Sequence, residues 1–314
     1  QEFEQWLNKK FLPQIEAIKS SGIVMGSQLS ADAYKTDAVR AVATGAGDEV
    51  YYVQNNGYKG TSLMHITADG NSEELVDLNY AVDLDLDAEA GLLLTQMEFC
   101  NNYTIYKDIY TYDKKNNSLK RLTECGRYLY ASWVPGGKQI IAAHNNAGRP
   151  ELQLLDENAQ LQEVLWQALD EEILGQIDIS PDSKKVVASK WRRGDGWNLE
   201  LFDLAEKRWQ KITRGVNIAA YPQFDAEGNI LFSLETKGVY NLHRYSFSTG
   251  KVEQITNLIG GAFQSSQASP QGAVYYAAYT AQGYAIYKLD IEEAKHFDAV
   301  DDSAWLADEH IQLI

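Results

Sequence analysis

The stretch Ile179-Ser180-Pro181-Asp182-Ser183-Lys184-Lys185-Val186-Val187 joins a tight turn to the start of an apolar strand. Proline presets φ for a turn and glycine supplies positive φ, so segments of this kind predict hairpin connections. Related turns, each followed by a short hydrophobic strand, recur at intervals of roughly 42 to 47 residues. The six turns are Thr44-Gly45-Ala46-Gly47, Asp87-Ala88-Glu89-Ala90, Val134-Pro135-Gly136-Gly137, Ser180-Pro181-Asp182-Ser183, Asp225-Ala226-Glu227-Gly228 and Ser269-Pro270-Gln271-Gly272. Six copies of one structural unit therefore make up most of the chain.

Each unit continues in the same way after its turn. In the fourth copy, the apolar strand Val186-Val187-Ala188-Ser189 is followed by a polar loop and by a third strand of alternating character, residues 198–203. A second turn then leads into a fourth strand, and the fourth strands share an ending: Arg121-Leu122-Thr123, Lys211-Ile212-Thr213 and Gln254-Ile255-Thr256. Short strands with period-two alternation indicate an all-β protein. Repetition of a four-stranded unit favours a six-bladed β-propeller over a sandwich or a single barrel.

The two ends of the chain are expected to meet in the last blade. The sixth unit supplies only three clear strands, up to residue 291, and Ser27-Gln28-Leu29-Ser30 resembles the ending of the other fourth strands. We therefore expect residues near 22–30 to complete this blade, which would remove an open seam and its unpaired edge. Truncation of either end should then unfold the ring. The resulting division is a helix or linker over 1–20, the propeller over 21–291 and an acidic tail over 292–314.

The opening residues have a different pattern. Phe3, Trp6, Leu7 and Phe11 lie among polar residues and predict a short amphipathic helix, which Pro13 should break or kink. The chain begins with Gln1, and no basic segment followed by an apolar one comes after it, so a signal peptide is absent or already removed.

The repeat resembles that of the TolB-like propellers of bacterial periplasmic and other exported proteins. The match rests on residues 179–187 and on the run from Gln254-Ile255-Thr256-Asn257 through Gly260-Gly261-Ala262-Phe263 to Ser269-Pro270-Gln271-Gly272. The second run looks like large exported proteins in which such a propeller accompanies metallopeptidase-like and outer-membrane domains. The resemblance covers roughly residues 22–291, although the first two turns lack the Ser-Pro pair and Val134 replaces Ser in the third. It implies a periplasmic or cell-envelope location and a role in docking partner proteins.

Composition narrows the classes of partner. The net charge of −16 disfavours nucleic acid, which requires clustered Lys and Arg, and simple adsorption to anionic membranes. No stretch approaches the roughly 18 to 20 continuous apolar residues of a membrane helix, so no direct membrane insertion by this chain is expected. Cys100 and Cys125 are too few for a disulfide scaffold or a thiolate zinc site, but they could form one bridge in an exported protein.

Sequence motifs give no support for catalysis. There is no HExxH, G-x-S-x-G or Walker A motif, and the five histidines show no ligand spacing, so we predict no catalytic residues, no metal site and no cofactor. Asp83, Asp85 and Asp87 alternate with leucines and should share one face of a strand. A solvated polar face is the expected reading, and a structural calcium ion is the alternative.

Topology points to one face of the ring as the candidate binding surface. In a propeller, the loops joining second to third strands and those leading to the next blade gather around one mouth of the channel. Arg, Trp and Tyr are enriched in binding hot spots. The candidate residues in these loops are Trp191, Arg192, Arg193, Asp195, Trp197, Arg149, Arg127, Tyr130, Lys237, Tyr240 and Tyr284, with Tyr128, Asn145, Asn146, Phe263 and Gln264 near them. The alternative is that these residues have structural roles. Arg192 or Arg193 would then pair with Asp195, the tryptophans would pack between blades, and Phe263 would pack between blades as well.

These residues favour a non-catalytic propeller that binds a protein or peptide, or holds adjacent domains of a longer chain. One alternative is the gating propeller of a larger peptidase, for which seven or eight blades would be stronger support. Another is a hydrolase with its site in the channel, which requires convergent carboxylates or a metal.

Overall fold

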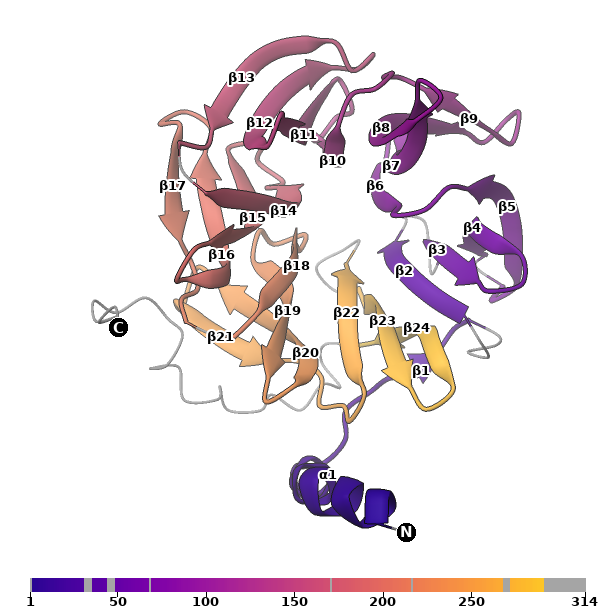
Figure 1. Cartoon of the computed structure of the whole chain (residues 1–314), viewed down its shortest axis with the longest axis vertical. Helices are drawn as coiled ribbons and strands as arrows, with labels where there is room; N and C mark the ends of the chain where they lie inside the picture. Colours follow the sequence, from indigo (N-terminus) through magenta and orange to yellow (C-terminus); the bar gives the residue numbers. More distant parts are fainter. Residues whose placement is uncertain are drawn as a thin grey trace.

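The fold is a ring of six four-stranded antiparallel sheets (Figure 1). The computed structural model describes residues 2–30, 36–43, 49–67, 69–169, 171–215, 217–267 and 272–290. The turn expected at 44–47, residues 269–271 of the sixth turn and the acidic tail over 292–314 lie outside the described residues. Within them, the predicted six-bladed propeller is confirmed.

The strands follow one another from the inside of the ring outward in each blade. Blade 1 contains β2 (Thr36–Ala43), β3 (Val50–Asn56), β4 (Gly60–Ile66) and β5 (Ser72–Leu78). Blade 2 contains β6 (Asp83–Asp87), β7 (Gly91–Cys100), β8 (Thr104–Asp113) and β9 (Ser118–Arg121). Blade 3 contains β10 (Tyr128–Trp133), β11 (Gln139–Asn146), β12 (Arg149–Asp156) and β13 (Leu161–Gln167).

The remaining blades repeat this order. Blade 4 contains β14 (Glu172–Ile179), β15 (Lys185–Arg192), β16 (Gly196–Asp203) and β17 (Arg208–Lys211). Blade 5 contains β18 (Ala219–Phe224), β19 (Ile230–Thr236), β20 (Val239–Ser246) and β21 (Lys251–Gln254). Blade 6 contains β22 (Gly261–Ser266), β23 (Val274–Thr280) and β24 (Gly283–Leu289), and its outer strand is β1 (Ser27–Gln28) from the other end of the chain.

The hydrophobic core lies between neighbouring blades. Val187 and Leu199 of blade 4, for example, pack in one cluster with Phe224 and Phe232 of blade 5. The second strands are the most buried because both of their faces meet another blade, which explains why they are continuous apolar runs in the sequence.

The threonine that follows the fourth strand in blades 2, 4 and 5 has a structural role. Thr213 Oγ1 accepts a hydrogen bond from the Leu199 amide at 2.9 Å and donates one to the Asn198 side chain at 3.2 Å. Thr123 with Asp108 and Thr256 with Asn241 repeat the arrangement in blades 2 and 5. The recurring Leu/Ile-Thr ending therefore continues the pairing of the third and fourth strands beyond the last regular strand residue.

Closure of the ring by the N-terminal strand is confirmed. Ser27 and Gln28 pair with Lys288 and Tyr287 of β24. Ser30 Oγ then accepts the Ile286 amide at 3.0 Å, as the threonines do in other blades. The resemblance of residues 27–30 to the shared ending thus reflects the same hydrogen bonding.

Helix α1 (Glu2–Ser21) forms where the sequence predicted a helix, but it continues through Pro13 without a break. No residue of α1 is buried, so tertiary packing does not oppose the local adjustment that an internal proline requires. Figure 1 shows α1 outside the ring, next to blades 5 and 6. Gln14 Nε2 donates to the Lys237 carbonyl at 2.8 Å, which attaches the helix to blade 5.

Candidate functional site

The candidate site lies on the face that carries the turns between second and third strands, which we call the upper face. Residues 193–195 and 237–238 form two of these turns, and Trp197 and Tyr240 are the second residues of the strands that follow them. Together with Tyr130, they line a cavity of about 250 Å³ at the channel mouth. The structure therefore brings three of the predicted residues together from blades 3, 4 and 5.

Two further side chains complete this cavity. Gln176 Nε2 donates to the Tyr130 hydroxyl at 3.2 Å, linking blade 4 to blade 3. Tyr221 also lines the cavity, from a bulge in β18 where its φ is 54°. Bulges redirect side chains, and this one turns Tyr221 towards the mouth. Burial, together with the charge of Glu235, raises the pKa of Tyr240, so its phenol stays protonated and can donate a hydrogen bond to a ligand.

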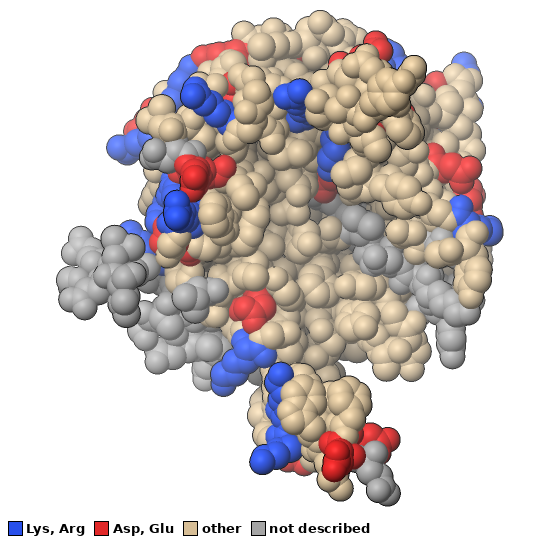
Figure 2. Space-filling view, in the orientation of Figure 1, with Lys and Arg blue, Asp and Glu red and all other residues tan. Residues whose placement is uncertain are grey.

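A row of aromatic rings extends from the cavity into blade 6. The ring centroid of Phe263 lies 5.0 Å from that of Tyr240 and 6.0 Å from that of Tyr284. Tyr279, which is 47% exposed, continues the row at 4.9 Å from Tyr284. In Figure 2 the area over β22–β24 is mostly uncharged, whereas Lys, Arg, Asp and Glu gather towards other parts of the ring. Phe263 thus has the packing role that the sequence suggested, and it also connects two predicted residues.

A second cavity of about 370 Å³ lies between blades 2 and 3. Its apolar walls include Met97, Ile105 and Leu129, and its polar groups include Arg127 and Lys107. Lys107 Nζ lies 4.9 Å from the centre of the Tyr130 ring, so Tyr130 connects the two cavities. Arg127 and Asn145 were predicted for this face, whereas Lys107 was not.

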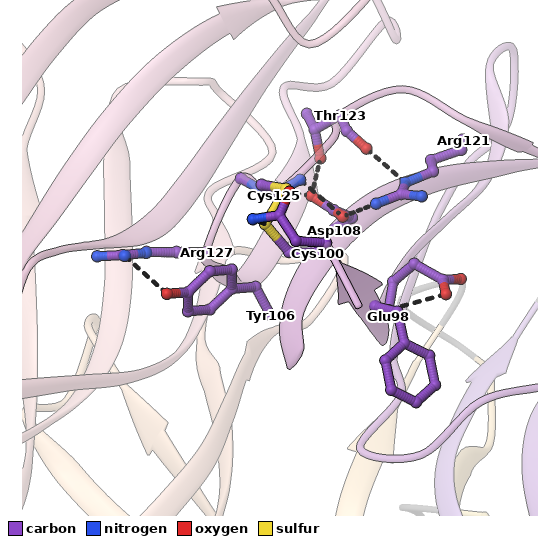
Figure 3. The surroundings of a disulfide bond; sticks show 11 residues. Glu98, Cys100, Tyr106, Asp108, Arg121, Thr123, Cys125 and Arg127 are labelled. Atoms are coloured by element: carbon purple, nitrogen blue, oxygen red, sulfur yellow. Dashed lines mark hydrogen bonds and ion pairs between the residues drawn. A yellow bond between two sulfur atoms is a disulfide. The ribbon is translucent and has the colours of Figure 1, made fainter. Parts of the chain in front are cut away.

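A disulfide and a buried carboxylate hold the loop that carries Arg127 (Figure 3). Cys100 at the end of β7 is bonded to Cys125, with 5.1 Å between their Cα atoms, so the bridge that the sequence left open is present. Asp108 is fully buried and accepts hydrogen bonds from Arg121 at 2.6 Å and from the Gly126 amide at 2.7 Å. The path of residues 121–127 is thereby fixed from both sides.

Arg192 belongs to an internal ion-pair cluster in blade 4. It binds Glu172, and its Nη2 donates to Glu200 at 2.9 Å. Lys190, almost fully buried beneath Trp166 and Trp209, pairs with the same two carboxylates at 3.1 and 3.7 Å. Burial raises the pKa of Glu200 and lowers that of Lys190, against the attraction between them. Arg192 therefore has local partners, as the alternative reading held, but they are Glu172 and Glu200 rather than Asp195.

The other predicted residues are dispersed. Asp195 pairs with Lys211, and exposed Arg193 pairs with Glu171 at 3.3 Å. Trp191 lies opposite Trp197 across β15 and β16. Arg149 is exposed at the start of β12, and Lys237 lies beside α1 rather than at the channel mouth.

The aspartates of β6 are not the solvated face that the sequence suggested. Asp83 and Asp85 are buried, and Asp85 accepts the Trp133 amide of blade 3 at 2.7 Å. Asp178 accepts the Phe224 amide of blade 5 at 2.6 Å in the same way. These carboxylates connect neighbouring inner strands because β6 and β14 lie at the channel, where the next blade supplies backbone donors.

The described part of the chain contains neither a cluster of metal ligands nor a membrane-spanning helix. There, no group of three or more His, Cys, Asp or Glu residues is placed to hold a metal ion. The single helix within the described ranges is too polar to cross a membrane. His65 and His243 are buried in strands, while His296 and His310 lie outside the described residues.

Similarity to known proteins is visible in the fold. No protein-family model matches the sequence, and no curated protein matches it. The solved structure of TolB from Acinetobacter baumannii superposes with a TM-score of 0.50 at 17% identity, over 83% of this chain and 67% of that one. The chain thus has a six-bladed β-propeller fold similar to TolB.

Two other solved structures show how widely this architecture is used. A puromycin hydrolase S511A mutant complexed with PGG has a TM-score of 0.54 at 15% identity, over 87% of this chain and 55% of that one. A nidogen/laminin complex gives 0.55 at 11% identity, over 69% and 79% respectively. The present chain spans about half the length of the puromycin hydrolase, and at these identities the likeness concerns the fold.

Several site residues could not have been found from the sequence. Tyr221 is directed by a bulge, and Lys107 reaches a cavity of the next blade from within β8. The only signal for Lys107 was a cation between two hydrophobic residues, Ile105 and Ile109, in an alternating strand.

Proposed function

We propose that this chain is a non-catalytic propeller that binds a protein or peptide on its upper face. The observation that carries the proposal is the position of two neighbouring cavities on this face. One is the aromatic cavity at the channel mouth, and the other is the cavity between blades 2 and 3 that contains Arg127 and Lys107. Tyr130 lines the first cavity and contacts Lys107 of the second. Tyr and Trp combine large contact area with hydrogen bonding and low conformational entropy, which suits them to peptide recognition. The TolB and nidogen/laminin structures support a protein-binding role by analogy of fold.

We further propose that the protein acts in the bacterial cell envelope, either alone or as a scaffold within a longer chain. The Cys100–Cys125 disulfide supports an oxidising compartment, because such bonds persist mainly in exported proteins. The likeness to TolB supports the same location.

The gating propeller of a larger peptidase is the second candidate. The likeness to about half of the puromycin hydrolase chain favours it, since this chain matches a part of that longer protein. The six sheets of the described residues support the docking role instead, because seven or eight blades were the stronger indication of gating.

The test is affinity capture from bacterial envelope extract with three proteins: the intact chain, Tyr130→Ser/Tyr240→Ser, and Phe247→Ser. Phe247 is a partly exposed aromatic of the opposite face and so serves as a matched control. Circular dichroism verifies that all three are folded. Loss of a discrete partner only with the Tyr130/Tyr240 variant supports the proposal. Equal capture by all three proteins contradicts the assignment of the upper face.

A further inference from the structure

The cavity between blades 2 and 3 is distinguished by its two cations. The protein carries 44 acidic residues against 28 Lys and Arg. Nevertheless, among the ion pairs of the residues that the structure describes, none joins Arg127 to a carboxylate, whereas Lys107 is attracted by the charge of the buried Asp83. The Arg127 guanidinium thus lines a largely apolar cavity without a carboxylate partner. Such a site favours an anionic ligand, because the ligand's charge-assisted hydrogen bonds would replace those that the guanidinium makes with water.

Both cations are held in place before any ligand arrives. The Arg127 guanidinium stacks on Tyr106, 4.4 Å from the ring centre, and its Nη2 donates to the Tyr106 hydroxyl at 2.8 Å. Lys107 Nζ donates to the Leu129 carbonyl at 2.6 Å. The disulfide and Asp108 fix the loop that leads to Arg127. Little side-chain entropy is therefore lost when these groups bind a ligand.

Apolar side chains form much of the remaining wall of the cavity. Met97 is 41% exposed and Ile105 is 51% exposed, and both lie in the long β7–β8 hairpin. Tyr103 at the tip of this hairpin is 94% exposed. A ligand that fills the cavity must therefore carry an anionic group and an apolar group close together, followed by a segment that can pass along the hairpin.

We infer that this cavity binds the C-terminal residue of a partner polypeptide, with the terminal carboxylate at Arg127 and Lys107 and an apolar last side chain against Met97, Ile105 and Leu129. Only at a chain end do a carboxylate and an apolar side chain belong to the same residue. An internal Asp or Glu would bring polar backbone on both sides against apolar walls. This inference rests on the proposed function and specifies which part of the partner is recognised.

The experiment measures binding of three short peptides to the intact, oxidised protein by isothermal titration calorimetry. The probe is acetyl-Gly-Leu-Leu with a free carboxylate. The controls are its C-terminal amide and acetyl-Gly-Leu-Asp-Gly-amide, which carries the carboxylate internally. The free acid is expected to bind at one site, with the amide and the internal acid each at least about tenfold weaker.

Variants assign the site. Arg127→Gln and Lys107→Met should each weaken binding of the free acid by about tenfold. Arg208→Gln, an exposed arginine of the outer strand of blade 4 that lines neither cavity, should leave it unchanged. Near-ultraviolet circular dichroism checks that the variants keep their packing.

The inference is overturned if no peptide binds, if the amide or the internal acid binds as tightly as the free acid, or if the folded Arg127 and Lys107 variants bind the free acid as tightly as the wild type. None of these results affects the capture test with the Tyr130/Tyr240 variant, so the two failures are distinguishable.

Discussion

Asp108 is the residue on which the loop beside the disulfide depends. Its carboxylate is fully buried and accepts four hydrogen bonds, from Arg121, Thr123 and the amides of Cys125 and Gly126. Burial of a charge is tolerated only when it is this fully paired. In blades 4 and 5 the corresponding residue is Asn198 or Asn241, which binds the threonine without carrying a charge.

Asp108→Asn should destabilise the protein by about 3 kcal/mol, because the amide group places a donor against the donors that surround it. Urea denaturation compares this variant with Glu124→Gln, an exposed carboxylate of the same loop. Glu124→Gln should change the free energy of unfolding by less than about 0.5 kcal/mol. Similar values for the two variants would show that Asp108 does not organise the loop.

His243 makes the stability of the fold depend on pH. Burial lowers the pKa of its imidazole to about 4, against 6.5 when exposed, and its Nδ1 lies 3.0 Å from the Asn241 carbonyl. The unfolded chain therefore binds a proton on His243 between pH 6.5 and 4 that the folded chain does not. Stability present above pH 6.5 is lost as the pH falls towards 4.

Replacing His243 with Phe should reduce this loss. Between pH 7 and pH 4, His243→Phe is expected to lose about 3 kcal/mol less stability than the wild type. The variant lacks the titrating imidazole, whereas all other titrating groups are the same in both proteins. Chemical denaturation at several pH values measures the difference. Parallel stability curves for the two proteins would contradict the buried, neutral state of His243.

At the scale of the elements, the disulfide ties the β7–β8 hairpin to the crossover between blades 2 and 3. It closes a loop with a sequence separation of 25 residues. Cys100→Ser/Cys125→Ser should lower the free energy of unfolding by about 2 to 4 kcal/mol. The wild type in reductant should behave like the double variant. Unchanged stability of both would show that Asp108 alone fixes the crossover.

The seam between β1 and β24 depends on a close approach at Gly26. Its φ is +75°, and a Cβ there would lie 2.2 Å from the Lys288 carbonyl oxygen. Gly26→Ala should therefore destabilise the protein by about 2 kcal/mol or more. Gly57→Ala is the matched control because a Cβ at Gly57 meets nothing within 4 Å. Equal thermal denaturation midpoints for the two variants would mean that the close approach of Gly26 to β24 is not needed for stability.

At the scale of the whole molecule, the sequence predicted the ring because each blade repeats the same local chemistry. The turn spacing, the apolar second strands and the Leu/Ile-Thr endings all reflect contacts within one blade or with its neighbour. The ring closure could also be predicted from the sequence, since Ser30 accepts the same kind of backbone hydrogen bond in blade 6 that a threonine accepts in blades 2, 4 and 5.

The binding surface was only partly predictable, because it depends on how blades meet. Trp197, Tyr130 and Tyr240 converge as the topology required, but the direction of Tyr221 depends on a bulge that no sequence pattern specifies. Arg192 is held by Glu172 and Glu200, from strands on either side of β15. The sequence contains many carboxylates in similar local contexts. Which of them lies beside Arg192 depends on the pairing of neighbouring strands, so residue spacing alone could not predict Glu172 and Glu200 as its partners.

Closure makes the N-terminal strand essential for the ring while leaving α1 dispensable. Deletion of residues 1–20 should retain a cooperative unfolding transition, because α1 buries none of its residues. Deletion of residues 1–30 removes β1 and exposes the edge of β24, so the ring should lose cooperative unfolding. Circular dichroism melting distinguishes the two. A cooperative transition in the shorter protein would contradict the coupling of the termini.

The most direct test of upper-face binding is site-specific photo-cross-linking in bacterial envelope extract. A photoreactive phenylalanine analogue replaces Tyr240 at the channel mouth in one protein and Phe247 on the opposite face in the other. Binding through the upper face predicts a discrete cross-linked species from position 240 and none from position 247. Cross-linking from position 247 alone, or equally from both positions, would contradict it.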